Sequence, residues 1–149
     1  MFWNNPLTSS DALVRRRRFA LAVSEFDLKW ITIARLGSES VGFGIEVEYE
    51  RARSALADFS IICMLLNFSA KNYSEMLALE CRLAKAASLS IDAVKELEHT
   101  CKKRGLKVSF RFGAICRGVR SVLRSSRGLV PAPGSPTSEI FTPLGERAA

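Results

Sequence analysis

Two short segments of this chain alternate strictly between apolar and polar side chains, and this period restricts the backbone more than any other feature of the sequence. The first segment reads Ile45-Glu-Val-Glu-Tyr-Glu50 and the second reads Leu106-Lys-Val-Ser-Phe-Arg-Phe112. Successive side chains of a β-strand point to opposite faces of a sheet, so this alternation predicts strands with one buried face. We therefore predict strands at residues 42–49 and 106–112.

A third strand is expected over residues 29–36, where the sequence allows two interpretations. The β-branched and aromatic residues fit a strand, yet their spacing also fits a continuation of the preceding helix. Gly37-Ser-Glu-Ser40 is good turn material and favours a hairpin between residues 29–36 and 42–49. The expected fold class is α+β, a small antiparallel or mixed sheet of about three strands packed by four to five helices.

The expected helices follow from apolar periodicity and from residues that begin or end helices. Asn72, with Glu75 three residues later, resembles a capping box, and Gly105 after a basic turn is typical of a helix C-terminus. Ser90 is interpreted as the cap of a separate helix. The predicted helices span residues 11–26, 51–67, 72–87, 90–104 and 114–126.

A single domain is expected, because the chain has 149 residues, 48% of them hydrophobic and 25% charged, as globular domains with one core do. We predict that the domain spans residues 10–127, after a flexible lead at residues 1–9. Residues 128–149 are rich in Pro, Gly, Ser and Thr and predict a disordered tail. The longest apolar run, Phe59–Ala70, is too short for a bilayer and predicts a buried helix rather than an integral membrane segment.

The residue types that carry catalysis or metal binding form no recognisable site. Cys63, Cys81, Cys101 and Cys116 lack the spacing of zinc ligands, and His99 is the single histidine. No nucleophile stands beside a base in the sequence, so we expect no catalytic residue, no metal, no cofactor and no enzyme activity. The cysteines are expected to be buried free thiols, which favours an intracellular, reducing compartment such as the cytoplasm or the nucleus.

Positive charge is concentrated near the C-terminus. The net charge is +7, and residues 101–149 hold ten Lys and Arg against two acids. At about 100° per residue, the four arginines of the last predicted helix fall within about 80°, so one helix face is cationic and the other apolar. The candidate binding residues of this C-terminal patch are Lys102, Lys103, Arg104, Lys107, Arg111, Arg117, Arg120, Arg124 and Arg127.

A second basic cluster, Arg15–Arg18, lies on the first predicted helix. It is interpreted as a localisation signal, as the exposed start of a helix, or as a second patch that contacts phosphates. The last interpretation requires the fold to bring Arg15, Arg16, Arg17 and Arg18 close to the C-terminal patch.

Such a patch favours polyanions, because phosphate binding releases counterions and arginine forms paired hydrogen bonds with phosphate oxygens. The leading hypothesis is a non-enzymatic accessory protein that binds RNA or DNA, with RNA favoured over DNA, largely without sequence preference. The alternative is an adaptor that docks an acidic protein through the same face, and attachment to an anionic membrane ranks last. In a fourth interpretation the basic face has no ligand: it is solvated and serves solubility, or Glu46, Glu48 and Glu50 neutralise it internally. A homo-oligomer is compatible with the sequence.

Overall fold

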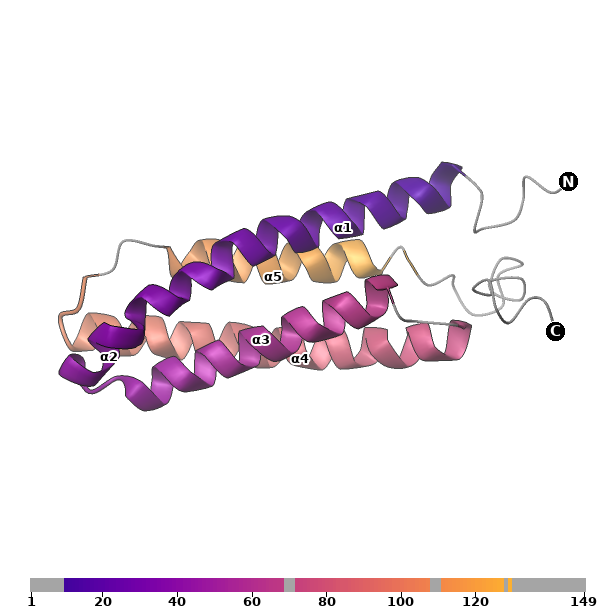
Figure 1. Cartoon of the computed structure of the whole chain (residues 1–149). Helices are drawn as coiled ribbons and strands as arrows, with labels where there is room; N and C mark the ends of the chain where they lie inside the picture. Colours follow the sequence, from indigo (N-terminus) through magenta and orange to yellow (C-terminus); the bar gives the residue numbers. More distant parts are fainter. Residues whose placement is uncertain (1–9, 69–71, 108–110, 128, 130–149) are drawn as a thin grey trace, which may run out of the picture.

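The computed structural model describes residues 10–68, 72–107, 111–127 and 129, and every regular element within them is helical (Figure 1). The predicted lead at residues 1–9 and the predicted tail, apart from residue 129, lie outside this part of the chain. The elements in chain order are α1 (Ser10–Trp30), the 3₁₀-helix η2 (Ile31–Leu36), α2 (Gly37–Phe43), α3 (Glu46–Phe68), α4 (Tyr73–Lys103) and α5 (Phe112–Ser126).

The four long helices form an antiparallel bundle. Figure 1 shows α1, α3, α4 and α5 running alongside one another, with the chain reversing direction between each helix and the next. The most extensive contacts are between α3 and α4 and between α1 and α5, while α4 with α5 and α1 with α3 close the ring. The bundle therefore consists of an α1/α5 pair on one side and an α3/α4 pair on the other.

The core runs along the bundle axis as a seam of apolar residues spaced three and four apart. In α3 this spacing includes the buried residues Ala52, Leu56, Phe59, Cys63 and Leu66. The centre of the seam is aromatic, because Phe59 packs edge-to-face on Phe26 of α1 with ring centroids 5.1 Å apart. Alternating steps of three and four keep one helix face toward its neighbours, which is the packing of antiparallel bundles.

The three predicted strands, and with them the α+β fold class, are wrong. Residues 29–36 complete α1 and form η2, and residues 42–49 comprise the end of α2, a turn and the start of α3. A strand would bury Val47 on the same side as Ile45 and Tyr49, but Val47 is 65% exposed whereas Ile45 is buried. Ile45 and Tyr49 instead continue the seam of α3 at a spacing of four, so the helical period prevails over the alternation.

The prediction of a strand at residues 106–112 also fails. Leu106 and Lys107 follow α4 without strand structure, and Phe112 is the first residue of α5. Residues 108–110 of this predicted strand lie outside the described part of the chain. Phe112 is buried together with Ile115, Val119 and Val122 of α5, again three or four residues apart. The apolar end of the alternating segment therefore belongs to a helix seam rather than to a sheet face.

The predicted ends of α4 are confirmed. The Asn72 side chain accepts a hydrogen bond from the Glu75 backbone N–H at 2.8 Å and caps the first turn. At the other end, Gly105 adopts a left-handed conformation with φ of 74°, and the Leu106 N–H donates to the Cys101 carbonyl at 2.9 Å. This Schellman arrangement satisfies carbonyls of the last turn, and glycine adopts its positive φ without steric cost.

The predicted helix boundary at Ser90 is wrong, since α4 continues through it for 31 residues. Ser90 is fully buried, and its hydroxyl donates to the Ala55 carbonyl of α3 at 3.0 Å. A small hydroxyl at this position lets α3 and α4 approach closely while its polar atom stays hydrogen-bonded. Ser90 therefore joins two helices instead of beginning one.

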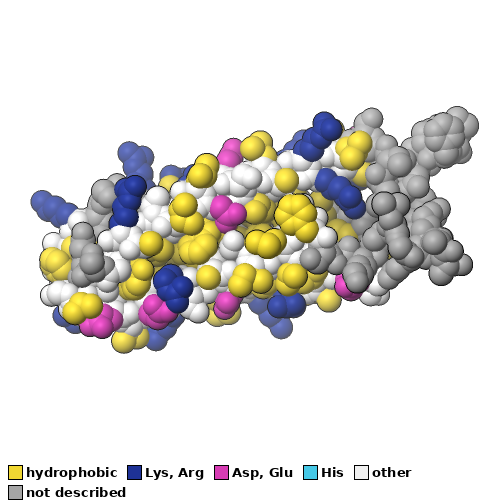
Figure 2. Space-filling model, in the orientation of Figure 1, with side chains coloured by type: hydrophobic (Ala, Val, Ile, Leu, Met, Phe, Trp, Pro, Cys, Tyr) yellow, Lys and Arg dark blue, Asp and Glu magenta, His cyan; other side chains and the backbone are white. Residues whose placement is uncertain are grey.

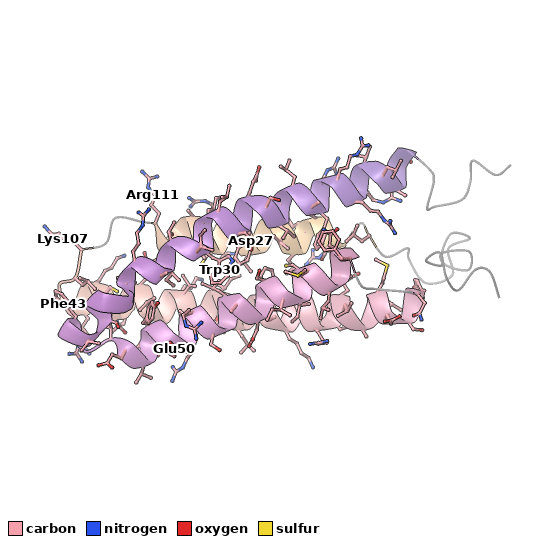
Figure 3. The ribbon with its side chains drawn as sticks, viewed as in Figure 1. Asp27, Trp30, Phe43, Glu50, Lys107 and Arg111 are labelled. Carbon is pink, nitrogen blue, oxygen red and sulfur yellow. The ribbon has the colours of Figure 1, made fainter. Side chains whose placement is uncertain are left out.

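A second polar contact joins α1 to α3, two helices that pack less extensively than the pairs α1/α5 and α3/α4. Asp27 accepts hydrogen bonds from Trp30 Nε1 at 2.9 Å and from Ser60 Oγ at 3.1 Å. Figure 3 shows Asp27 and Trp30 on the side of α1 that faces α3. The partly buried carboxylate is thus satisfied by one donor from its own helix and one from its neighbour.

The apolar run at residues 59–70 is only half buried. Within α3, Ile61, Met64 and Phe68 are 54%, 57% and 78% exposed, while Phe59 and Cys63 are fully buried. The prediction of a buried helix therefore holds for one face of the run and is wrong for the other. None of the described helices is both long enough and apolar enough to cross a membrane.

The four cysteines are free thiols, but they differ in burial. Cys63, Cys101 and Cys116 are buried as predicted, whereas Cys81 is exposed on α4, which corrects the expectation of four buried thiols. Burial raises the pKa of the Cys63 thiol to about 12 and also raises that of Cys116. The thiolate is the nucleophile, so both buried groups are unreactive near neutral pH.

We expect one fast-reacting thiol when the folded chain is treated with an aromatic disulfide reagent at pH 8. Cys81 is the only exposed cysteine, so Cys81→Ser should remove the fast phase, while denaturant should expose the remaining thiols. The absorbance of the released aromatic thiolate measures the number of fast-reacting thiols in the folded chain and the number exposed by denaturant. Two or more fast thiols in the folded protein would contradict this burial pattern.

Candidate nucleic-acid interface

Helix α5 carries the basic face that the sequence predicts. Ile115, Val119 and Val122 are buried against the bundle, and the predicted helix at residues 114–126 is confirmed with a start two residues earlier. The arginines on the opposite side are all exposed: Arg117, Arg120, Arg124 and Arg127. Buried apolar residues thus fix the helix rotation that presents the arginines to solvent.

The second basic cluster meets this helix because α1 and α5 are antiparallel neighbours. Gly118 of α5 lies directly against Phe26 of α1, so the N-terminal half of α1 runs beside the C-terminal half of α5. Figure 2 shows Lys and Arg side chains standing out at both ends of this upper side of the molecule. Arg15 and Arg18 are thereby placed at the same end of the bundle as Arg124.

These arginines share one concave surface, which we call the basic cleft. It is a hollow of about 400 Å³ between α1 and α5. Its lining residues are Arg15, Arg18, Leu21, Ala22, Glu25, Ser121, Arg124 and Ser125. Arg16 and Arg17 are exposed but do not line it. Three guanidinium groups and two hydroxyls surround the cleft with a single carboxylate, so its charge favours an anion.

The arginines of α5 are not neutralised by the acids of residues 46–50. Glu50 forms its ion pair with Arg53 of the same helix, and this partner lowers the Glu50 pKa. Among the described residues, the ion pairs join Arg51 to Glu96, Arg53 to Glu50 and Lys102 to Glu98. Internal neutralisation by Glu46, Glu48 and Glu50 is therefore not what the structure shows, and the cations of the basic cleft face solvent.

Part of the predicted C-terminal patch has structural partners instead. Lys102 pairs with Glu98 at 3.6 Å one turn earlier in α4. Arg104 donates from Nη1 to the Phe43 carbonyl at 3.4 Å, at the C-terminal end of α2. There it approaches the Gly44 turn, whose φ is 69°. Both side chains are thereby held at the far end of the bundle from the basic cleft.

Lys103, Lys107 and Arg111 are exposed around the connection between α4 and α5. Figure 3 shows Lys107 and Arg111 projecting away from the helices at that end. They are separated from the basic cleft by most of the length of α5, on which Arg117 and Arg120 lie between them. The structure thus places the predicted residues in two groups, one at each end, connected by the arginines of α5.

Arg127 turns toward α4, where it lines a small hollow of about 170 Å³ together with Glu80. Burial raises the pKa of the Glu80 carboxyl, and the charge of Arg127 offsets part of that increase. One oxygen of Glu80, Oε2, is buried without a hydrogen bond within the described residues. Because Arg127 interacts electrostatically with the Glu80 carboxylate, it is less available to an external anion than Arg124.

Sequence reasoning missed several residues of the cleft and one larger hollow elsewhere. Ser121, Ser125 and Glu25 line the cleft, and only the pairing of α1 with α5 identifies them. A groove of about 760 Å³ between α3 and α4, which we call the outer groove, was also not predicted. The sequence feature that could have indicated the outer groove is the spacing of three and four between apolar residues in α3 and in α4. This spacing predicts that the two helices pack as a pair with a furrow along the outer side.

Among the described residues, there is no cluster of three or more His, Cys, Asp or Glu side chains that could bind a metal ion. His99 is exposed on α4, away from the basic cleft.

Comparison of this chain with protein-family models, with curated proteins and with solved structures finds no match.

Proposed function

We propose that this protein is a non-enzymatic accessory protein that binds nucleic acid through the basic cleft and the arginines of α5, largely without sequence preference. The observation that carries this proposal is the convergence of Arg15 and Arg18 with Arg124, more than a hundred residues later, on one concave surface. An anion in the cleft would contact cations from both helices at once. These guanidinium groups converge and form no ion pair within the described part of the chain, and they suit phosphate, whose oxygens accept two N–H donors from one guanidinium.

The spacing of the arginines on α5 also fits a nucleic-acid strand. At about 1.5 Å per residue, Arg117, Arg120 and Arg124 extend over roughly 10 Å of helix axis. A strand carries one phosphate per about 3.4 Å of duplex axis, so this row corresponds to roughly three nucleotides. Ser121 and Ser125 lie beside it and can donate hydrogen bonds to phosphate oxygens.

The composition of the cleft supports binding without sequence preference. Among the described residues, its lining contains no aromatic side chain on which a base could stack and no Asn or Gln to read a base edge. Affinity would come from phosphate contacts, which hold the strand but do not distinguish bases. Binding should therefore depend steeply on salt and little on base sequence.

Fluorescence anisotropy with labelled single- and double-stranded RNA and DNA tests this proposal. The variant Arg15/Arg18/Arg124→Gln should bind at least about tenfold more weakly at low salt. Its slope of log K against log salt should be shallower by roughly 2 to 3, because each lost phosphate contact contributes about 0.7 to 0.9.

A matched control removes three charges outside the cleft, in Lys29/Arg35/Lys95→Gln, and leaves the same net charge. This variant should keep most of the affinity and most of the salt slope. Equal losses in both variants would show that only net charge matters, and absence of binding by the wild type at low salt would contradict the proposal. Preference for RNA over DNA is read from the same titrations.

A further inference from the structure

The outer groove lies between α3 and α4. In Figure 1 these two helices form the opposite side of the bundle from α1 and α5, whose residues line the basic cleft. Its lining includes the small or buried side chains of Ala55, Ile62, Ala86 and Ala93. Two large apolar side chains of its lining are exposed, Ile61 at 54% and Leu89 at 65%. An apolar furrow lined by exposed leucine and isoleucine is typical of a surface that packs against another helix.

The charged residues on the outer face of α4 form a pattern with antiparallel symmetry around Leu89. Arg82 and Lys85 lie seven and four residues before Leu89, and Asp92 and Glu96 lie three and seven residues after it. Residues at these spacings share one face of a helix, and all four charged side chains are exposed and line the groove. One half of this face is therefore basic and the other half acidic.

From this pattern we infer that the outer groove is the interface of an isologous homodimer, with Leu89 next to the two-fold axis. Antiparallel pairing of two α4 helices places Lys85 opposite Asp92 and Arg82 opposite Glu96 of the second copy, twice over by symmetry. A parallel arrangement would bring like charges together. Each Leu89 side chain enters the furrow of the other copy between its α3 and α4.

Electrostatics of the whole chain favours this face over others for self-association. A net charge of +7 makes two copies repel each other. The groove, however, balances its three bases, including Arg51, with three acids, including Asp58. Arg51 already donates to Glu96 Oε1 at 2.8 Å, and Oε2 of Glu96 has no partner among the described residues, so it can accept from Arg82 of the second copy.

The outer groove and the basic cleft share no residue, so the dimer does not depend on the proposed function. The α1/α5 pair lies on the opposite side of each bundle from the α3/α4 pair (Figure 1). A dimer formed through the outer groove therefore leaves both basic clefts open and directs them away from each other.

Sedimentation equilibrium of the full chain at moderate salt, over a wide range of concentrations, tests the dimer. Wild type should show a concentration-dependent dimer. Leu89→Arg, Lys85→Glu and Asp92→Lys should each weaken it by more than about tenfold, since reversed or buried charges cost more than the ~1.4 kcal/mol of a tenfold change. Far-UV circular dichroism should remain helical, because these side chains are exposed.

The decisive experiment mixes the two single charge variants. Each alone places two like-charge contacts across the axis, but a heterodimer of Lys85→Glu with Asp92→Lys restores both opposite-charge pairs and should associate about as well as wild type. A wild-type chain that stays monomeric at all concentrations would overturn the inference. So would a dimer that is insensitive to all three variants, or a mixture that does not associate.

Discussion

Replacing Phe59 by alanine is expected to lower the free energy of unfolding by about 3 to 5 kcal/mol. Phe59 has no exposed surface and packs edge-to-face on Phe26, so the change removes apolar contacts and leaves a cavity between α1 and α3. A domain of this size has a total stability of about 5 to 15 kcal/mol, and the variant should be marginal. Urea unfolding followed by far-UV circular dichroism measures the loss.

The matched control is Phe68→Ala, which makes the same chemical change in the same helix. Phe68 is 78% exposed, and its replacement should alter the free energy of unfolding by no more than about 0.5 kcal/mol. Equal losses at the two positions would show that the exposed face of α3 is covered in solution. That result would contradict the half-buried arrangement of the apolar run.

Replacing Gly118 by leucine is expected to lower the free energy of unfolding by about 1 to 3 kcal/mol or more. A Cβ atom at this position would lie 3.4 Å from Phe26 Cδ1 and 3.6 Å from Phe26 Cα. Alanine fits at ordinary contact distance and gains helix propensity, so Gly118→Ala should be neutral or stabilising by up to about 1 kcal/mol. Leucine has no room there unless α1 and α5 separate.

Thermal unfolding distinguishes these outcomes, since 1 kcal/mol corresponds to a Tm shift of roughly 4 °C in a domain of this size. Gly113→Leu is the control on the same helix, because Gly113 is exposed and a Cβ there meets only the Arg117 side chain at 3.4 Å. If Gly118→Leu proved as stable as Gly113→Leu, α1 and α5 would not be in close contact. The basic cleft would then lose its structural basis.

The errors in predicting the fold come from the length over which periodicity was judged. The alternation at residues 45–50 covers six residues and satisfies a strand. Over a longer window, Ile45 and Tyr49 belong to a series with steps of four and three that continues to Leu66. The same holds earlier in the chain, where Phe19 and Phe26 of α1 are followed by Ile33 of η2, each seven residues after the last. A short segment can fit both periods, and only a long one separates them.

Predictions from a few neighbouring residues were confirmed where local backbone hydrogen bonding and conformation determine where a helix begins or ends. Asn72 caps α4 because its side chain reaches the N–H of Glu75 within one turn, whatever packs around it. Gly105 ends the same helix because its left-handed conformation favours glycine. Ser90 shows the opposite case, since a residue that caps helices in isolation is buried between α3 and α4 by tertiary packing.

The sequence by itself determined the amphipathic last helix, the ends of α4 and the concentration of positive charge near the C-terminus. These properties depend on neighbours within a few residues, so they can be inferred from the order of side chains alone. Only the tertiary structure brought Arg15 and Arg18 to Arg124 and opened the outer groove around Leu89. The basic cleft lies between α1 and α5, which are far apart in the sequence, and the outer groove lies between α3 and α4, whose packing sets their relative rotation. In both cases the helices pair because pairing buries their apolar seams.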